Sequence, residues 1–130
     1  MNFSDDPDPS VDDGSRLPAF DLRDRTFDYA LSMIRFVAAL PESRELSFPG
    51  DALMKSGTSV GAHYREAHRC RSKPEFGPKI QDCLAALELA AYWLDVMEHL
   101  PSAESPDIDR LKDETAQLTA IFMSIARKTR

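Results

Sequence analysis

The spacing of apolar residues between prolines most strongly constrains how this chain folds. Four segments place apolar or small residues at alternating intervals of three and four, which lines one face of an α-helix. These stripes are Phe27, Ala30, Ile34, Val37 and Leu40; Leu53, Gly57, Val60, Tyr64 and Ala67; Ile80, Cys83, Leu87, Ala90, Leu94 and Met97; and Ile108, Leu111, Thr115, Leu118, Phe122 and Ile125. No segment alternates every two residues as a strand does, so the pattern predicts an all-α fold.

Prolines and capping residues predict where these helices begin and end. Pro41 ends the first helix, and Ser47 with Pro49 supplies an N-cap and a first-turn proline for the second. The pattern Ser-x-x-Glu at 72–75 is a capping box for the third helix, although Pro78 lacks the N–H that a sixth helical residue donates. The third helix therefore either starts at Gly77 or has a kinked first turn. Pro101 marks its end and Pro106 opens the fourth helix.

Short connections between the four segments favour antiparallel neighbours, so we expect an up-down-up-down four-helix bundle over residues 19–130. The preceding segment is different in composition. Residues 1–16 hold five Asp against one Arg, a net charge of -4 out of -6 for the chain of 130 residues. With three prolines and few large apolar side chains, residues 1–18 are expected to form a disordered acidic tail.

Composition also excludes several classes of protein. No apolar run approaches the roughly 20 residues that cross a bilayer, and the N-terminal segment is acidic where a signal peptide is basic. The two cysteines lie 13 positions apart without a Cys-x-x-Cys motif, so we expect free thiols rather than a disulfide framework or zinc site. These features predict a cytoplasmic protein with no membrane partner.

Catalytic and metal-binding patterns are weak. His63 and His68 point about 140° apart around a helix axis and cannot easily share one ion. Cys70 lies between Arg69 and Arg71, which can favour its thiolate, but a structural cysteine is the stronger interpretation, as it is for Cys83 on a predicted seam. We therefore expect no enzyme, no cofactor, no metal and no small-molecule substrate.

Two glycines inside the second predicted helix need an explanation, because each costs about 1 kcal/mol of helix stability relative to Ala. Gly57 and Gly61 leave a patch without side chains, which lets a neighbouring helix approach the backbone. That neighbour is either a helix of the same bundle or, at Gly61, which is off the main seam, a helix of another subunit.

The densest positive stretch lies at the turn between the second and third helices. Its members are the candidate nucleic-acid-binding residues Arg65, Arg69, Arg71, Lys73 and Lys79. Arg65 and Arg69 lie opposite the apolar stripe, where they can meet phosphate groups or the carboxylates of a partner. The alternative is a solvated or ion-paired face, in which Glu66 and Glu75 neutralise part of the charge.

The stretch from Lys55 to Phe76, with Ser-Gly-Thr-Ser-Val-Gly-Ala-His-Tyr-Arg-Glu-Ala at its centre, resembles the signature of bacterial four-helix-bundle proteins of the 23S ribosomal RNA intervening-sequence family. Tyr92-Trp93-Leu94 resembles that family as well. The motif residues are Ser56, Gly57, Thr58, Ser59, Gly61, Tyr64, Glu66, Tyr92 and Trp93. Two departures are His63, where the family usually has Asn, and the interruption at Gly77-Pro78.

The resemblance implies a compact homo-oligomeric ring of five bundles, a fold shared with the accessory variability determinant of diversity-generating retroelements. It also implies RNA or ribonucleoprotein partners. The motif residues are candidates for an oligomer interface or belong only to the family motif, and Tyr64, Tyr92 and Trp93 are candidate packing anchors because aromatic side chains bury large areas. Two functions remain open. One is a non-enzymatic scaffold that binds structured RNA or a nucleic-acid enzyme through the basic corner; the other is a protein–protein interaction scaffold whose arginines form salt bridges between subunits.

Overall fold

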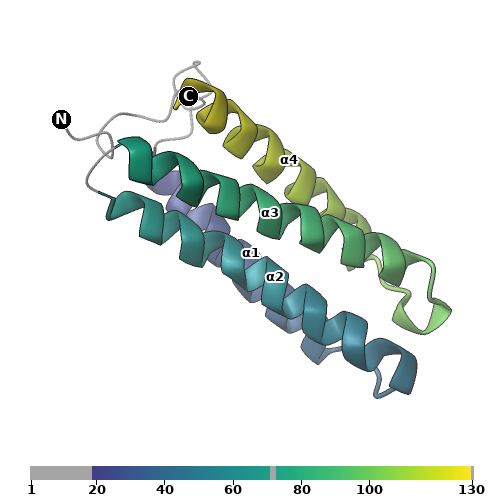
Figure 1. Ribbon diagram of the computed structural model, residues 1–130. Coiled ribbons are helices and arrows are strands. Elements are labelled where there is room, and N and C mark those ends of the chain that lie inside the picture. The colour runs from purple at the N-terminus through teal and green to yellow at the C-terminus, as the bar shows by residue number, and fades with distance from the viewer. Residues whose placement is uncertain (1–18, 71–72, 130) are drawn as a thin grey trace.

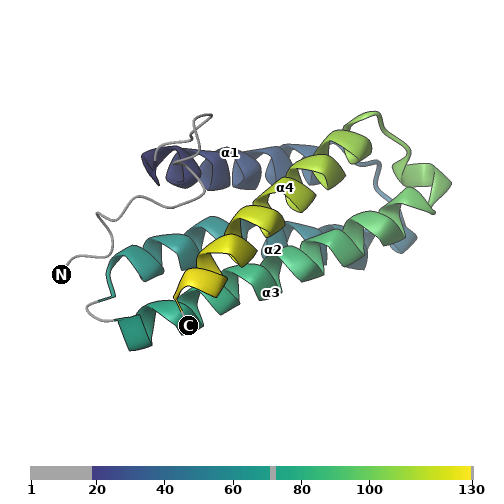
Figure 2. The ribbon, with the colours of Figure 1, turned by 90° about the horizontal axis from the view of Figure 1, so that it is seen from above.

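The computed structural model describes residues 19–70 and 73–129, and these form four antiparallel α-helices without a β-strand. The helices are α1 (Ala19–Ala38), α2 (Arg44–His68), α3 (Lys73–Glu98) and α4 (Asp107–Lys128), with a short 3-10 helix, η2 (Pro101–Ala103), before α4. Their directions alternate along the chain, as Figures 1 and 2 show. The predicted four-helix bundle is confirmed. The acidic segment 1–18 lies outside the described residues.

Both α2 and α3 begin earlier than their prolines suggested. The N-cap of α2 is Ser43 rather than Ser47, and Pro49 is the sixth residue of the helix. Likewise α3 runs from Lys73 through Pro78, so a start at Gly77 is wrong. A proline at the sixth position removes only a hydrogen bond to a first-turn carbonyl near the exposed helix end. Ser72 of the predicted capping box lies outside the described residues.

The core confirms three of the four predicted stripes. Every member of the stripes on α2, α3 and α4 is buried. The stripe predicted for α1 is wrong: Phe27 and Ile34 are 50% and 41% exposed, and only Val37 and Leu40 pack partly against the core. The residues of α1 that point inward are Leu22, Thr26, Tyr29, Met33 and Phe36. Within the described residues, no helix is long and apolar enough to cross a membrane.

Candidate nucleic-acid interface

One end of the bundle collects the basic side chains. The antiparallel order brings the start of α1, the end of α2, the start of α3 and the end of α4 to this end (Figure 1). Arg65 and Arg69 are exposed there, as expected from their position opposite the core stripe. Sequence reasoning missed Arg127 and Lys128, exposed in the last turn of α4, and Arg23 near the start of α1. The only feature of the sequence that could have indicated these three residues was their position near the ends of the predicted helices.

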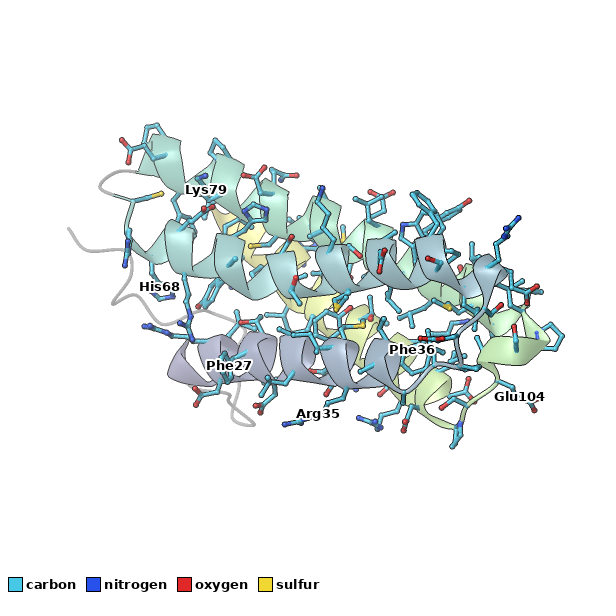
Figure 3. The ribbon with its side chains drawn as sticks, turned by 90° about the horizontal axis from the view of Figure 1, so that it is seen from below. Phe27, Arg35, Phe36, His68, Lys79 and Glu104 are labelled. Atoms are coloured by element: carbon cyan, nitrogen blue, oxygen red, sulfur yellow. The ribbon has the colours of Figure 1, made fainter. Side chains whose placement is uncertain are left out.

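Charge is therefore distributed unevenly along the bundle axis. The half built from residues 19–28, 57–70, 73–85 and 118–129 carries eight basic and six acidic residues. The opposite half, built from residues 29–56 and 86–117, carries five basic and eleven acidic residues. Figure 3 shows Phe27, His68 and Lys79 near the first end and Glu104 at the second. We call the first half the basic end.

Lys79 is neutralised by acidic neighbours. Its Nζ donates a hydrogen bond to Glu66 Oε1 at 3.2 Å and lies 3.9 Å from Asp82 Oδ2. His63 Nδ1 lies 3.0 Å from the same Glu66 oxygen. Hydrogen bonds from His63 and Lys79 lower the pKa of Glu66, and the bond to Glu66 raises the pKa of Lys79. The ion-paired alternative therefore describes Lys79 better than a free phosphate-binding cation does.

Arg65 and Arg69 form no salt bridge with another residue that the structure describes. The Arg65 guanidinium carbon lies 5.5 Å from the centroid of the Phe27 ring on α1. This cation–π contact orients the guanidinium at the surface while its N–H groups remain able to meet a phosphate. Arg71 lies outside the described residues, and Lys73 is described only as the first residue of α3.

His68 adds no positive charge to the basic end at neutral pH. Its ring packs edge to face against Tyr64, with centroids 4.6 Å apart. Burial, followed by the charge of Arg23, lowers the pKa of His68 below its usual value. The neutral imidazole is the form that this half-buried position favours.

Neither cysteine is activated. Burial, followed by the charge of Glu75, raises the pKa of Cys70, so the thiolate that Arg69 and Arg71 suggested is not favoured. Burial raises the pKa of Cys83 to about 12, as expected for a core position. Both thiols are free. Among the described residues, no three His, Cys, Asp or Glu side chains are grouped to hold a metal ion.

The glycines of α2 face α1 of the same chain. A Cβ atom on Gly57 would lie 2.4 Å from Met33 Cγ, and one on Gly61 would lie 3.1 Å from Thr26 Oγ1 and 3.3 Å from the Thr26 carbonyl oxygen. The interpretation of Gly61 as a contact for another subunit is therefore wrong. Its physical role is to let α1 and α2 approach closely within one bundle.

The hydroxyl residues of the motif bond to their own helix. Ser56 Oγ donates to the Ala52 carbonyl at 3.0 Å, Thr58 Oγ1 to Met54 at 2.8 Å, and Ser59 Oγ to Lys55 at 2.7 Å. Ser56 is also buried. These bonds satisfy the hydroxyl hydrogens locally, so the side chains contribute to α2 itself rather than to a catalytic arrangement.

The three aromatic motif residues divide between core and surface. Tyr64 is 3% exposed and packs edge to face on Phe122 of α4, with centroids 5.5 Å apart, so it is a core residue and not an anchor for another subunit. Tyr92 is 57% exposed, and Trp93 is half-buried. The Trp93 ring contacts Tyr92 at 5.0 Å and the exposed Phe48 of α2 at 5.5 Å, both edge to face.

These features define an all-α four-helix bundle with one basic end. No protein-family model and no curated protein matches the chain. The bundle is similar to the crystal structure of a protein of unknown function from the S23 ribosomal protein family of Bacteroides thetaiotaomicron. That similarity has a TM-score of 0.75 at 20% sequence identity and covers 82% of this chain and 98% of the other. It establishes a shared four-helix fold.

Proposed function

We propose that this chain is a non-enzymatic, oligomeric helical scaffold that binds structured RNA through its basic end. The observation that carries the proposal is the exposure of Arg65 and Arg69 without acidic partners among the described residues, at the same end of the bundle as the exposed Arg127 and Lys128 of α4. Guanidinium groups bind phosphate oxygens through paired N–H donors. Three arginines and one lysine, exposed at one end of the bundle on two helices, are available to the phosphates of an RNA backbone.

The small excess of positive charge at the basic end of one bundle is the reason that we propose an oligomer. The chain is acidic as a whole, and the excess of positive charge at the basic end is small. A single bundle therefore makes few phosphate contacts. Several copies that present the basic end around one rim would add these contacts by multivalency. The fold shared with a protein of the S23 ribosomal protein family, and the resemblance to intervening-sequence proteins, support an RNA partner and a ring.

The test is a titration of labelled structured RNA at low and moderate salt. The variant R65A/R69A is compared with wild type and with R44A, a matched control that removes an exposed arginine at the opposite end. We expect the double variant to bind several-fold more weakly and its salt dependence to fall by roughly two phosphate contacts, whereas R44A binds as wild type. Deletion of residues 1–16, which carry a charge of -4, should strengthen binding.

Absence of binding by the shortened chain at low salt, or equal binding by both arginine variants, would contradict the RNA proposal. The protein–protein scaffold would then be the better function. The pairing of Lys79 with Glu66 and Asp82, the acidic opposite end and the exposed Phe48 and Tyr92 favour that second candidate.

A further inference from the structure

Helix α1 carries a second apolar stripe that the bundle does not cover. Phe27, Leu31, Ile34 and Ala38 follow one another at intervals of four, three and four. Phe27 is 50% exposed, Ile34 is 41% exposed, Ala38 is exposed and Leu31 is half-buried. The core-facing side of α1 consists of other residues, so these four side chains form a separate face. We call them the α1 stripe.

Helix α3 carries a second stripe with the same spacing. Its members, the α3 stripe, are Ala85, Leu89, Tyr92 and Val96. Leu89 is 54% exposed and Tyr92 is 57% exposed, while the core stripe of α3 is fully buried on the other side of the helix. Helix α3 therefore carries apolar residues on two opposite faces, although the bundle buries only one of them. The adjoining ring contacts of Trp93 with Tyr92 and Phe48 extend this exposed face toward α2.

The two stripes lie on different sides of the bundle. Helix α2 packs along both α1 and α3, and Figure 3 shows α1 and α3 at opposite edges with α2 between them. A single chain thus presents two unlike apolar faces that cannot meet each other. Each stripe runs about 17 Å along its helix, so the lengths match.

The charges beside the stripes disfavour pairing of α3 with itself. Residues 80–98 hold four acidic residues and no Lys or Arg, and two of the four, Asp95 and Glu98, pair with Lys112 of α4. Helix α1 holds three arginines and three aspartates; Arg25 pairs with Glu114, and Arg65 of α2 lies over Phe27. Two α3 stripes in contact would place acidic residues opposite acidic residues, whereas the α1 side offers Arg23, Arg35 and Arg65, which form no salt bridge with another described residue.

We propose that the α1 stripe of one chain packs against the α3 stripe of a second copy, head to tail. The proposal rests on the homo-oligomer of the proposed function and names its contact surfaces. Equal spacing lets the side chains of the two stripes interdigitate as in a coiled coil. Because the two surfaces differ, a growing assembly keeps one free stripe at each of its two ends, and it closes into a ring when the rotation between neighbouring copies allows.

A complementation experiment tests the pairing. I34D blocks the α1 stripe and L89D blocks the α3 stripe; both residues are exposed, so far-ultraviolet circular dichroism should show wild-type helicity. Each variant alone should run by light scattering as a monomer of 14.6 kDa. An equimolar mixture should give the mass of two chains, because I34D retains the α3 stripe and L89D retains the α1 stripe. The matched control M123D changes an exposed apolar residue of α4 outside both stripes and should keep the wild-type mass.

The outcomes separate the two proposals. A monomeric wild type overturns the oligomer and this pairing together. A wild-type oligomer that persists in I34D and L89D overturns the pairing alone, and a mixture that stays monomeric rules out head-to-tail contact. If either variant loses helicity, chains with I34C and L89C in a C70S background, mixed and treated with a bis-maleimide, should form cross-linked pairs. If the mixed cysteine variants form an oligomer of wild-type mass but no cross-linked chains appear, the pairing of the two stripes is also overturned.

Discussion

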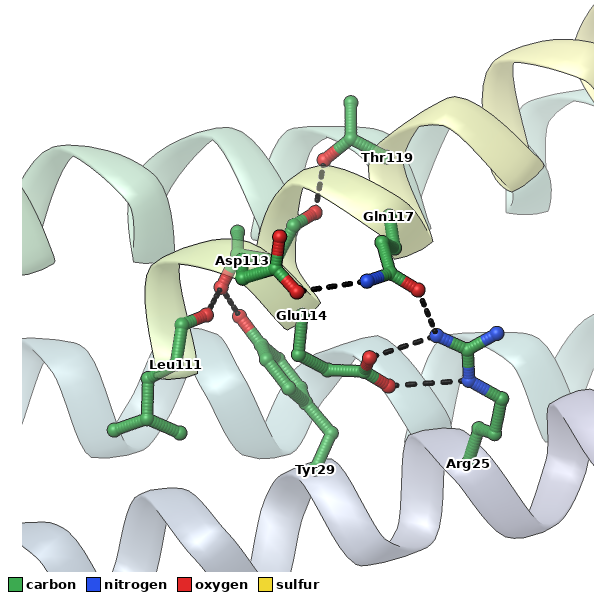
Figure 4. Close-up of polar contacts among 8 residues, drawn as sticks. Arg25, Tyr29, Leu111, Asp113, Glu114, Gln117 and Thr119 are labelled. Carbon is green, nitrogen blue, oxygen red and sulfur yellow. Dashed lines mark hydrogen bonds and ion pairs between the residues drawn. The ribbon is translucent and has the colours of Figure 1, made fainter. Parts of the chain in front are cut away.

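Helix α1 is held in two different ways by its two neighbours. On the side of α2, glycine allows direct contact, since Met33 fills the space that a Cβ on Gly57 would occupy. On the side of α4, polar groups make the contact (Figure 4). Tyr29 Oη lies 2.6 Å from Thr115 Oγ1, and Arg25 donates to both carboxylate oxygens of Glu114 at 2.7 and 3.1 Å.

The difference indicates which of the two helix contacts is more sensitive to a small substitution. The contact with α2 depends on shape, because an added methyl group has no space between two closely packed helices. The contact with α4 depends on hydrogen bonds, each of which contributes about 1 kcal/mol net. We therefore expect substitutions on the α2 side to be the more damaging.

The largest expected effect follows from Gly57→Ala. The new Cβ would lie 2.4 Å from Met33 Cγ and 3.1 Å from Met33 Cβ, so the Met33 side chain or α1 itself must shift. We expect the free energy of unfolding to fall by about 1–3 kcal/mol in urea denaturation. Adding Met33→Ala should cost less than the sum of the two single changes, since the residues share one space.

Gly77→Ala is the matched control for this comparison. It also lies within a helix, but the nearest atom to its added Cβ is Thr129 Oγ1 at 4.0 Å. Without a steric conflict, the gain in helix propensity should stabilise the protein by about 0.5–1 kcal/mol. Equal effects of the two glycine substitutions would show that propensity, not the close approach of α1, determines the result.

An intermediate effect is expected on the α4 side, with an asymmetry between partners. Thr115 Oγ1 donates to the Leu111 carbonyl at 2.7 Å, so the Tyr29 hydroxyl is the donor in the bond to Thr115. Thr115→Val leaves that buried donor without its partner and should cost about 1–2 kcal/mol, whereas Tyr29→Phe removes the donor and should cost less, about 1 kcal/mol. Urea denaturation of both variants measures the difference; a more damaging Tyr29→Phe would contradict the donor assignment.

The smallest effect is a change of stability at alkaline pH. Burial raises the pKa of Tyr29 from 10.0 to about 12, so the folded state favours the protonated phenol. This contribution is complete below the unfolded pKa near 10 and is lost as the pH rises through the folded pKa. The wild type should therefore lose more stability than Tyr29→Phe when thermal unfolding is compared at about pH 9 and about pH 11. Identical losses would mean that Tyr29 does not contribute.

The exposed cations of the proposed RNA-binding end could be predicted from the sequence only in part, as could the core. Arg65 and Arg69 were found because they lie opposite a clear apolar stripe in one helix. Arg127 and Lys128 were missed because only the antiparallel order brings the end of α4 to the same end of the bundle as the end of α2. The neutralisation of Lys79 also depends on a contact between helices, with Glu66 thirteen residues earlier.

The four helices, their order and the inward faces of α2, α3 and α4 could be predicted from the sequence, because one apolar stripe on each of these helices is longer than any other and the connections are short. On α3 the inward stripe has six residues and the exposed one has four. The sequence did not identify the inward face of α1. That helix has apolar side chains on two faces, and its core stripe includes the polar Thr26, which spacing alone does not identify. Tertiary structure decides between them, because Met33 and Thr26 lie against Gly57 and Gly61, whereas Phe27 and Ile34 remain outside.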